Sequence, residues 1–334
     1  MLLSLIIPFY NVEPYFEACL KGLETLPEET EILLIDDCGK DGSLKIAQRF
    51  CKCTKNARVI SRVKNGGLSA ARNTGLAQAV GEYVFFLDSD DIPDGMAIYE
   101  AAEEARRTGA EIIKGRFSYL FEDGTRLNSP AVPAGKEMRG RDLFLEECRQ
   151  NTFQPMVWQC VYKRLFLQEQ HLSMQEGLLF EDEVFLTPAL FRAGKVLYTD
   201  RFLLSYRQRK GSIMGGMQKS AAWCKSYMEI CRFMNRFAEG ETEDAAVQAL
   251  RVRIGKIALS IGKNIPAYQL SGEVRAEAEA FLYRNRREIS RYALKSPSYP
   301  VKLQGSLLRF SPGLFLRMYS LLWLRGHKEE IWGK

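Results

Sequence analysis

An uncharged run of aromatic and branched residues at 83–87 is followed at once by Asp88-Ser89-Asp90-Asp91. Such a run is typical of a buried strand. Three carboxylates within four residues repel one another unless a cation or water lies among them. Oxygen ligands suit Mg²⁺ or Mn²⁺, which shares its coordination with substrate phosphates, although solvated aspartates in a turn would give the same pattern. Nucleotides bind where the strands of an open α/β sheet end, so the cluster is a candidate nucleotide site.

Strand-like and helix-like segments alternate along the first half of the chain, which is typical of βαβ units and a mostly parallel sheet. We expect strands at 2–7, 31–35, 57–61 and 83–87 and from 112, and helices at 13–26, 43–50, 68–80 and 96–108. The later helical patterns are at 217–239, 244–262 and 273–292. Because only helical patterns remain after Gly215-Gly216, we predict an α/β catalytic domain at 1–215 and a helical region at 216–334.

Cysteine content, apolar runs and charge distribution indicate what kind of protein this is. Eight scattered cysteines among 334 residues, without metal-ligand spacing, indicate free thiols in a reducing, cytoplasmic compartment. The apolar start of the chain is too short for a signal peptide, and no run of ~18 apolar residues predicts a transmembrane helix. Residues 216–334 carry 20 lysines and arginines against 11 acidic residues, which favours an anionic partner for that part.

Polar residues also follow the first and second predicted strands. Pro8, Tyr10 and Asn11 come where the crevice of an open sheet would lie, and the loop lacks the G-x-G-x-x-G pattern of dinucleotide-binding proteins. Asp36 and Asp37 end the second strand, where a carboxylate can accept hydrogen bonds from a nucleobase imide or a ribose hydroxyl. An ordinary strand-to-helix turn and a helix-capping turn would explain the same residues.

Further charged positions fit a reaction on a phosphorylated substrate. Arg72 follows the glycine turn 65–67 at a helix start, where it can pair with a carboxylate or a phosphate. Glu181 and Asp182 begin a helical pattern and are candidates for a general base, although helix N-termini favour acidic residues for electrostatic reasons alone. Arg207 lies in a basic loop suited to a diphosphate leaving group. A surface salt bridge would also explain Arg72, and exposed basic loops such as that of Arg207 are common.

Five linked motifs make the first 95 residues resemble glycosyltransferase family 2. They are Ser4 to Asn11, Asp36-Asp37 with Asp41-Gly42-Ser43, Ala71 to Leu76, Gly81-Glu82-Tyr83, and Leu87 to Asp91. The resemblance is extended to about residue 215 by Val157-Trp158, Tyr162-Lys163-Arg164 and Glu181-Asp182. Cys38-Gly39-Lys40 departs from the Gly-Ser that usually follows the two aspartates of the family, which leaves the base contacts of that loop open.

The resemblance implies a GT-A fold, which is a Rossmann-like mixed sheet, and inverting transfer of a sugar from a nucleotide diphosphosugar, most often UDP-linked. It implies that Asp90, with Asp88, holds Mg²⁺ or Mn²⁺, and that Asp182, or Glu181 beside it, is the base. Pro8, Tyr10 and Asp37 would hold the uracil and ribose, and Asp91 would be either a sugar contact or a turn residue. The complete expected donor site is Pro8, Tyr10, Asn11, Asp36, Asp37, Arg72, Asp88, Asp91 and Arg207.

The C-terminal segment 301–334 mixes leucine and aromatic residues with basic ones. Such a segment can lie among the headgroups of an anionic membrane, which would make the protein peripheral on the inner face of the plasma membrane. The acceptor would then be a glycan or a lipid-linked oligosaccharide of a surface polysaccharide. A helix packed on the catalytic domain or in an oligomer would have the same composition. Because no recognised nucleic-acid motif accompanies the basic residues, we do not expect nucleic acid as a partner.

Two other functions stay open. A nucleotidyltransferase also uses clustered aspartates and a metal, but it is expected to have a glycine-rich basic loop where this chain has Pro8-Phe9-Tyr10-Asn11. A non-catalytic nucleotide-sugar-binding protein would have no need for Asp90 and Asp182 together.

Overall fold

The computed structural model describes residues 1–130, 135–209 and 220–326. The chain forms two compact units, Met1–Phe144 with Gln154–Ser212 and Leu145–Phe153 with Ile213–Lys334. The domain transition predicted at Gly215-Gly216 lies outside the described residues. The second unit also takes in Leu145–Phe153, which the sequence pattern assigns to the first.

The first unit is built on a mixed sheet with the strand order β3-β2-β1-β4-β9-β6-β10-β5. Strands β1 to β4 run parallel, β9 is antiparallel to β4 and β6, and β10 is parallel to β6. The bounds are β1 (Leu3–Phe9), β2 (Thr30–Asp36), β3 (Ala57–Ser61), β4 (Tyr83–Phe86), β5 (Ile92–Pro93), β6 (Ile112–Leu120), β7 (Arg126–Asn128), β8 (Glu137–Met138), β9 (Cys160–Lys163) and β10 (Val196–Arg207).

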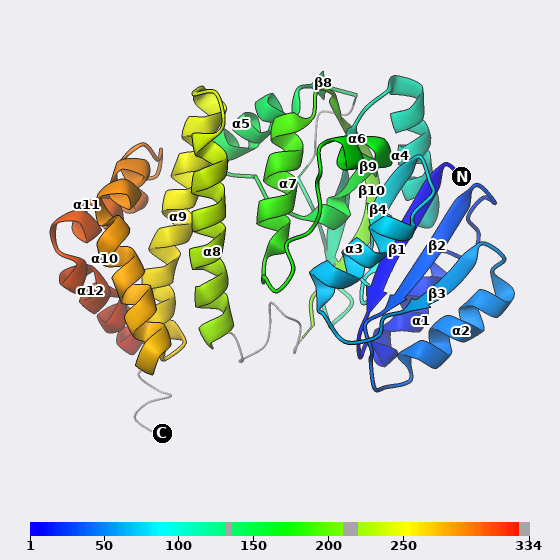
Figure 1. Ribbon diagram of the computed structural model, residues 1–334, viewed down its shortest axis with the longest axis horizontal. Helices are drawn as coiled ribbons and strands as arrows, with labels where there is room; N and C mark the ends of the chain where they lie inside the picture. The colour runs from blue at the N-terminus through cyan, green and yellow to red at the C-terminus, as the bar shows by residue number, and fades with distance from the viewer. Residues whose placement is uncertain (131–134, 210–219, 327–334) are drawn as a thin grey trace. The chain divides into compact units, whose positions relative to one another are not determined.

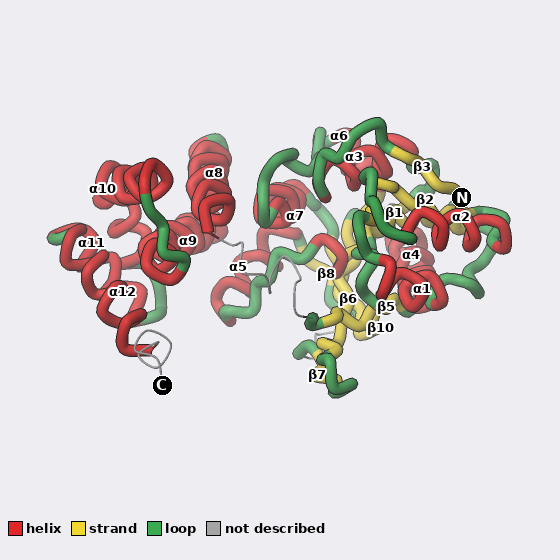
Figure 2. The backbone as a smooth tube through the Cα atoms, turned by 90° about the horizontal axis from the view of Figure 1, so that it is seen from below, coloured by secondary structure: helices red, strands yellow, loops and turns green. Residues whose placement is uncertain are grey.

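Helices cover both faces of this sheet (Figure 2). Strand β1 is buried throughout, as a central parallel strand between two helical layers must be. Leu3, Leu5 and Ile7 share a core with residues of α1, α2 and α4. On the other face, α3 lies so close that a Cβ on Gly75 would be 2.3 Å from Ile6. The helices are α1 (Glu13–Lys21), α2 (Ser43–Cys53), α3 (Leu68–Gln78), α4 (Gly95–Thr108), α5 (Gly140–Gln150), α6 (Arg164–Glu169) and α7 (Glu181–Arg192), with a 3₁₀ turn at Val157–Gln159.

One predicted element differs clearly from the structure. The helix expected at 13–26 ends at Lys21, because the following turn packs against the backbone of β5. A Cβ on Gly22 would lie 2.5 Å from the carbonyl oxygen of Pro93. The apolar residues that suggested a longer helix, such as Leu23, are buried in the same core from a turn instead.

The second unit is helical, as predicted (Figure 1). Its packing uses glycines at the helix contacts: a Cβ on Gly262 would lie 2.3 Å from the ring of Phe315, and one on Gly305 would lie 2.5 Å from Ala293. All eight cysteines are free, as predicted. Within the described residues, none of the helices combines the length and apolarity needed to cross a bilayer. The helices are α8 (Ser220–Glu239), α9 (Ala245–Ala267), α10 (Gly272–Leu294), α11 (Tyr299–Phe310) and α12 (Pro312–Gly326).

Candidate active site

The carboxyl ends of β1, β2 and β4 meet at one edge of the sheet. Strand β1 lies between the other two, with Phe9 in register with Asp36 and Ile6 with Phe86. The chain runs outward from β1 to β2 and β3 and then returns to β4 on the other side. Open α/β sheets bind their ligands at such a change of direction, between the loops that follow the two strands, here β1 and β4. The cluster that begins at Asp88 comes directly after β4, so it lies where the sequence pattern predicted a nucleotide site.

A buried arginine joins this cluster to the other acidic pair. Arg72 of α3 is 1% exposed, and its guanidinium donates to Asp88 Oδ1 at 2.6 Å, Glu181 Oε1 at 2.7 Å and Asp182 Oδ1 at 3.1 Å. Burial alone would lower the pKa of Arg72, but the three carboxylates raise it. The sequence left open whether Arg72 pairs with a carboxylate or a phosphate. In this structure it holds carboxylates that are up to 110 residues away along the chain.

Of the two acids at the start of α7, Asp182 is better placed to meet a substrate. Its side chain is 19% exposed, against 8% for Glu181, and its second oxygen accepts a hydrogen bond from the Val157 amide at 3.3 Å. Burial raises the pKa of Asp182 to about 8, although Arg72 opposes the shift. A carboxylate with a pKa near the working pH is an efficient proton acceptor, so Asp182 has the properties of a general base.

The remaining carboxylates of the β4 loop meet the end of β10. Asp90 Oδ2 pairs with Arg209 at 2.8 Å, and the backbone oxygen of Asp90 accepts from Arg207 Nε at 2.8 Å. Burial, followed by the charge of Asp88, raises the pKa of Asp90, while Arg209 opposes the shift. Both arginines lie over the ring of Tyr15, with guanidinium-to-centroid distances of 5.3 and 4.8 Å. Two basic side chains, Arg207 and Arg209, therefore adjoin the carboxylate cluster.

Asp91 lies in the interior of the protein. It is fully buried, Oδ1 accepts from the Arg207 amide at 2.8 Å, and Oδ2 has no protein partner. Burial and the charges of Asp88 and Asp90 raise its pKa well above the usual value. Of the two roles that the sequence left open for Asp91, this position fits the turn residue, which fastens β10 to the β4 loop.

Asp37 organises the glycine turn that precedes α3. Its carboxylate pairs with Arg62 and accepts the amides of Gly66 at 3.0 Å and Gly67 at 2.8 Å. Its backbone oxygen accepts from the Asn65 side chain at 2.9 Å. Asp37 thus shapes the loop that precedes Arg72, and its contact with a nucleobase stays a prediction.

The residues after β1 and β2 hold the loop that departs from the family pattern. Asn11 Oδ1 accepts from the Lys40 amide at 2.7 Å, and Asp36 Oδ1 accepts from the Gly39 amide at 3.2 Å. Pro8 is buried within β1, whereas Tyr10 is 46% exposed and free to face a ligand. The loop is therefore fixed by the same side chains that the sequence pattern assigned to the nucleotide.

Three side chains at the site were not among the predicted ones. Arg62 balances Asp37, Arg209 balances Asp90, and Tyr15 supports Arg207 and Arg209. Arg209 belongs to the basic loop that the sequence singled out, and the position of Arg62 just after β3 was a usable signal. Tyr15 had none, because a tyrosine in an amphipathic helix is common.

Comparison with known proteins places this chain among similar sequences and structures. The model of the family described as glycosyl transferase family 2 matches residues 4–168. The uncharacterized glycosyltransferase EpsJ of Bacillus subtilis is 33% identical over 217 residues, which cover 64% of this chain and 62% of EpsJ. A poly(ribitol-phosphate) beta-glucosyltransferase of Bacillus spizizenii is 30% identical over 203 residues, 59% of this chain and 30% of the relative. The chain thus matches less than two thirds of the length of either relative.

A solved structure extends the similarity in fold to nearly the whole chain. The crystal structure of S. aureus TarS 1–349 in complex with UDP-GlcNAc has a TM-score of 0.75 at 20% identity, and the match covers 98% of this chain and 92% of TarS 1–349. The predicted fold class, a GT-A mixed sheet with a C-terminal helical region, is confirmed. Residues 4–168 of this chain therefore belong to glycosyltransferase family 2.

Proposed function

We propose that the protein is an inverting glycosyltransferase that moves a sugar from a nucleotide diphosphosugar, of the UDP-linked kind, to a hydroxyl group of a glycan or lipid-linked oligosaccharide. The observation that carries the proposal is the guanidinium of Arg72, which holds Asp182 and the aspartate cluster after β4 in one site. The Arg72 guanidinium thereby holds the proposed base, Asp182, near Asp88, a carboxylate proposed to bind the nucleotide sugar.

The chemistry follows from what each group can do. Asp182 takes the proton of the acceptor hydroxyl as that oxygen attacks the anomeric carbon and the bond to the diphosphate breaks. Arg207 and Arg209 supply positive charge toward the departing diphosphate. A single displacement from the face opposite the leaving group inverts the anomeric configuration, and it needs no covalent intermediate on the enzyme.

The carboxylates of the β4 loop fit a divalent cation. The pKa of Asp90 is raised by burial and by the charge of Asp88, and a bound cation would relieve this repulsion. Among the described residues, no group of three or more potential ligands forms a protein-only site. We propose that Mg²⁺ or Mn²⁺ is held by Asp90 with Asp88, together with substrate phosphates, since such an ion is usually bound by one or two carboxylates. When bound, the ion would neutralise charge on the diphosphate.

Replacing Asp90 with alanine should abolish the part of UDP binding that depends on Mn²⁺, because the main ligand of the ion is then lost. Calorimetric titration of UDP with and without Mn²⁺ measures this dependence. A matched control is Asp123→Ala, which changes an aspartate in the exposed turn between β6 and β7. Equal UDP affinity in the Asp90 variant and the wild type, both with Mn²⁺, would rule out this metal site.

The proposed activity is tested by UDP release from a panel of UDP-sugars. A glycosyltransferase should release UDP, at least slowly to water, and faster when a hydroxyl acceptor is supplied. A nucleotidyltransferase would instead release pyrophosphate from a nucleoside triphosphate. A non-catalytic binding protein would be stabilised thermally by a UDP-sugar without releasing UDP.

We further propose that the last two helices contact an anionic membrane, which would bring the enzyme to a lipid-linked acceptor. Large apolar side chains on α11 and α12 are exposed, with Phe310 at 83% and Leu314 at 53%. Lys302, Arg309 and Arg317 are on the same two helices. Apolar side chains between basic ones fit the headgroup layer of such a membrane. Residues 327–334 of the predicted membrane segment lie outside the described residues.

The full-length protein should co-sediment with liposomes that contain phosphatidylglycerol and much less with phosphatidylcholine alone. Phe310→Glu should reduce this binding, because it puts a negative charge at the most exposed apolar position of α11. Val63→Glu is the matched control, since Val63 is a fully exposed apolar residue of the first unit. Protein that stays in the supernatant with both kinds of liposome would refute membrane attachment.

A further inference from the structure

Arg209 holds an oxygen atom that the proposed cation site needs. Its Nε and Nη2 groups both donate to Asp90 Oδ2, at 2.9 and 2.8 Å. Both side chains are largely shielded from water, with 21% of Arg209 and 22% of Asp90 exposed. A divalent ion bound to the same oxygen would lie about 2 Å from it, close to a second positive charge. The ion and the guanidinium therefore compete for Asp90.

Arg209 has a second contact that would keep it at the site if this ion pair opened. Its guanidinium lies over the ring of Tyr15 in α1, 4.8 Å from the centroid, and the face of an aromatic ring attracts a cation. A guanidinium that rests on a ring keeps its N–H groups at its edge. Arg209 can therefore exchange the carboxylate of Asp90 for a phosphate oxygen without leaving Tyr15.

Arg207 is anchored at the same place in a different way. Its guanidinium lies over the same ring, 5.3 Å from the centroid, but its Nε donates to the backbone oxygen of Asp90 at 2.8 Å. A backbone oxygen carries no net charge, whereas Arg209 holds the ionisable carboxylate. The two arginines thus share their surroundings and differ in the atom of Asp90 that they hold.

From these contacts we propose that Arg209 passes between two anions: it holds Asp90 until Mg²⁺ or Mn²⁺ takes that oxygen, and it then pairs with the diphosphate of the nucleotide. The inference rests on the proposed function, because it requires the cation at Asp90. A cation that binds alone has to break the ion pair, whereas a nucleotide diphosphate gives Arg209 a new partner. The two ligands therefore promote each other's binding, by the same factor in both directions.

Removal of the Arg209 guanidinium should change two affinities in opposite directions. In Arg209→Gln, Mn²⁺ alone should bind about tenfold more tightly, because no charged group has to leave Asp90 first. With saturating Mn²⁺, UDP should bind about tenfold more weakly, because a charge-assisted hydrogen bond to the diphosphate is lost. If Arg209 served only to keep the loop folded, its removal would weaken both kinds of binding.

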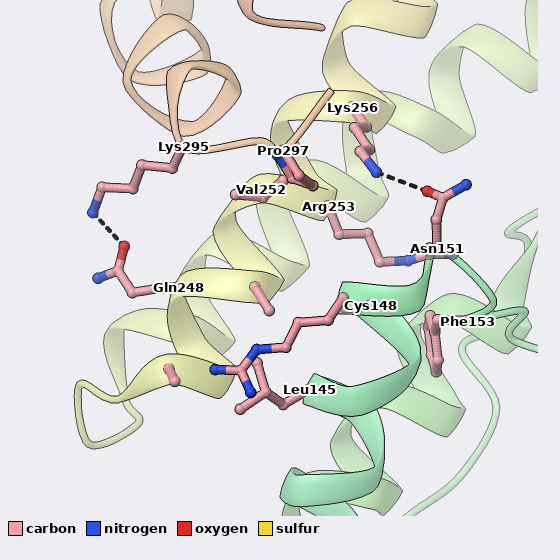
Figure 3. Close-up of a pocket in the computed structure, with 13 residues that line it drawn as sticks. Leu145, Cys148, Asn151, Phe153, Gln248, Val252, Arg253, Lys256, Lys295 and Pro297 are labelled. Atoms are coloured by element: carbon pink, nitrogen blue, oxygen red, sulfur yellow. Dashed lines mark hydrogen bonds between the residues drawn. The ribbon is translucent and has the colours of Figure 1, made fainter. Parts of the chain in front are cut away.

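The test measures Mn²⁺ binding by electron paramagnetic resonance of the free ion, and UDP binding by calorimetry, on the full-length protein. Arg207→Gln is the control for local charge: it removes a positive charge over the same ring and should raise the affinity for Mn²⁺ alone by less than about threefold. Lys256→Gln is the control for total charge. Lys256 belongs to the second compact unit, where it donates to Asn151 at 3.0 Å (Figure 3), and its loss should leave both affinities unchanged.

The experiment separates failure of the exchange from failure of the cation site. If the wild type binds no Mn²⁺ even with UDP, the cation site is wrong and the exchange of Arg209 is wrong with it. If the wild type binds Mn²⁺ with UDP, the exchange alone is refuted when Arg209→Gln binds Mn²⁺ no better than Arg207→Gln, or when its UDP affinity is unchanged. If Arg209→Gln does not fold, as judged by thermal unfolding, Arg209→Met gives the same test, because methionine can still cover the ring of Tyr15.

Discussion

Replacing Asp182 with asparagine should lower kcat by roughly 10²–10⁴-fold, the usual contribution of a general base, and leave donor affinity nearly unchanged. Asparagine keeps the size of the side chain and can still accept the hydrogen bond of the Val157 amide, but it cannot take a proton. Steady-state kinetics with a competent donor and acceptor, together with calorimetric UDP binding, separate the two effects. Asp123→Asn, in an exposed turn, is the matched control. If the Asp182 variant keeps near-normal turnover, the role of base passes to Glu181.

The pH profile gives an independent readout of the same assignment. Since burial raises the pKa of Asp182 to about 8, kcat/KM of the wild type should rise with pH through that value, and the asparagine variant should lack this rise. The folded-state pKa exceeds that of the unfolded chain, about 4. The contribution of Asp182 to stability is therefore full below about pH 4 and declines as pH rises toward 8. The variant should not show that decline in denaturant unfolding.

Replacing Arg72 with methionine should cost about 3–5 kcal/mol in the free energy of unfolding, because it removes the partner of buried charges, and it should abolish transfer. Arg72 is 1% exposed, and its loss leaves Asp88, Glu181 and Asp182 without the cation that they share. Methionine fills a similar volume, so the effect reports the loss of the charge and its hydrogen bonds and not the opening of a cavity. The measurement is urea unfolding at about pH 9, above the pKa of about 8 of Asp182, where a larger share of the three carboxylates is ionised.

The matched control for Arg72 is Arg49→Met. Arg49 pairs with Glu17 on the surface, and both side chains are about two thirds exposed, so its loss should cost no more than about 1 kcal/mol. For Arg72, the loss of stability should shrink as the pH falls toward 5, because the freed carboxylates then take up protons. A cost as small as that of the control, at every pH, would show that the guanidinium does not balance the three acids.

The strands that carry the candidate site could be predicted from the sequence, because local residue patterns determine them. A central parallel strand must be apolar on both faces, so β1 and β4 could be recognised from their sequences. Residues that directly follow parallel strands lie together at the carboxyl edge of the sheet. Asp88 and Asp90 could be placed on that basis alone.

Partnerships across long distances in the chain could not be predicted in this way. Nothing near Arg72 indicates that α3 packs where the start of α7 reaches it, since only the tertiary fold brings residues 72 and 182 together. The burial of Asp91 was equally hidden. Its sequence neighbours suggest an exposed turn, and only the backbone of β10 gives it an interior partner at Arg207.

The segment that matches the family model is shorter than the segment that forms the proposed active site. The match to the family model ends at residue 168, yet Glu181 and Asp182 come after it, as does β10, which lies between β6 and β5 in the sheet. A truncation at that boundary would retain the aspartates of the β4 loop but leave Arg72 with one of its three counter-ions. The smallest fragment worth expressing therefore extends at least through the end of β10.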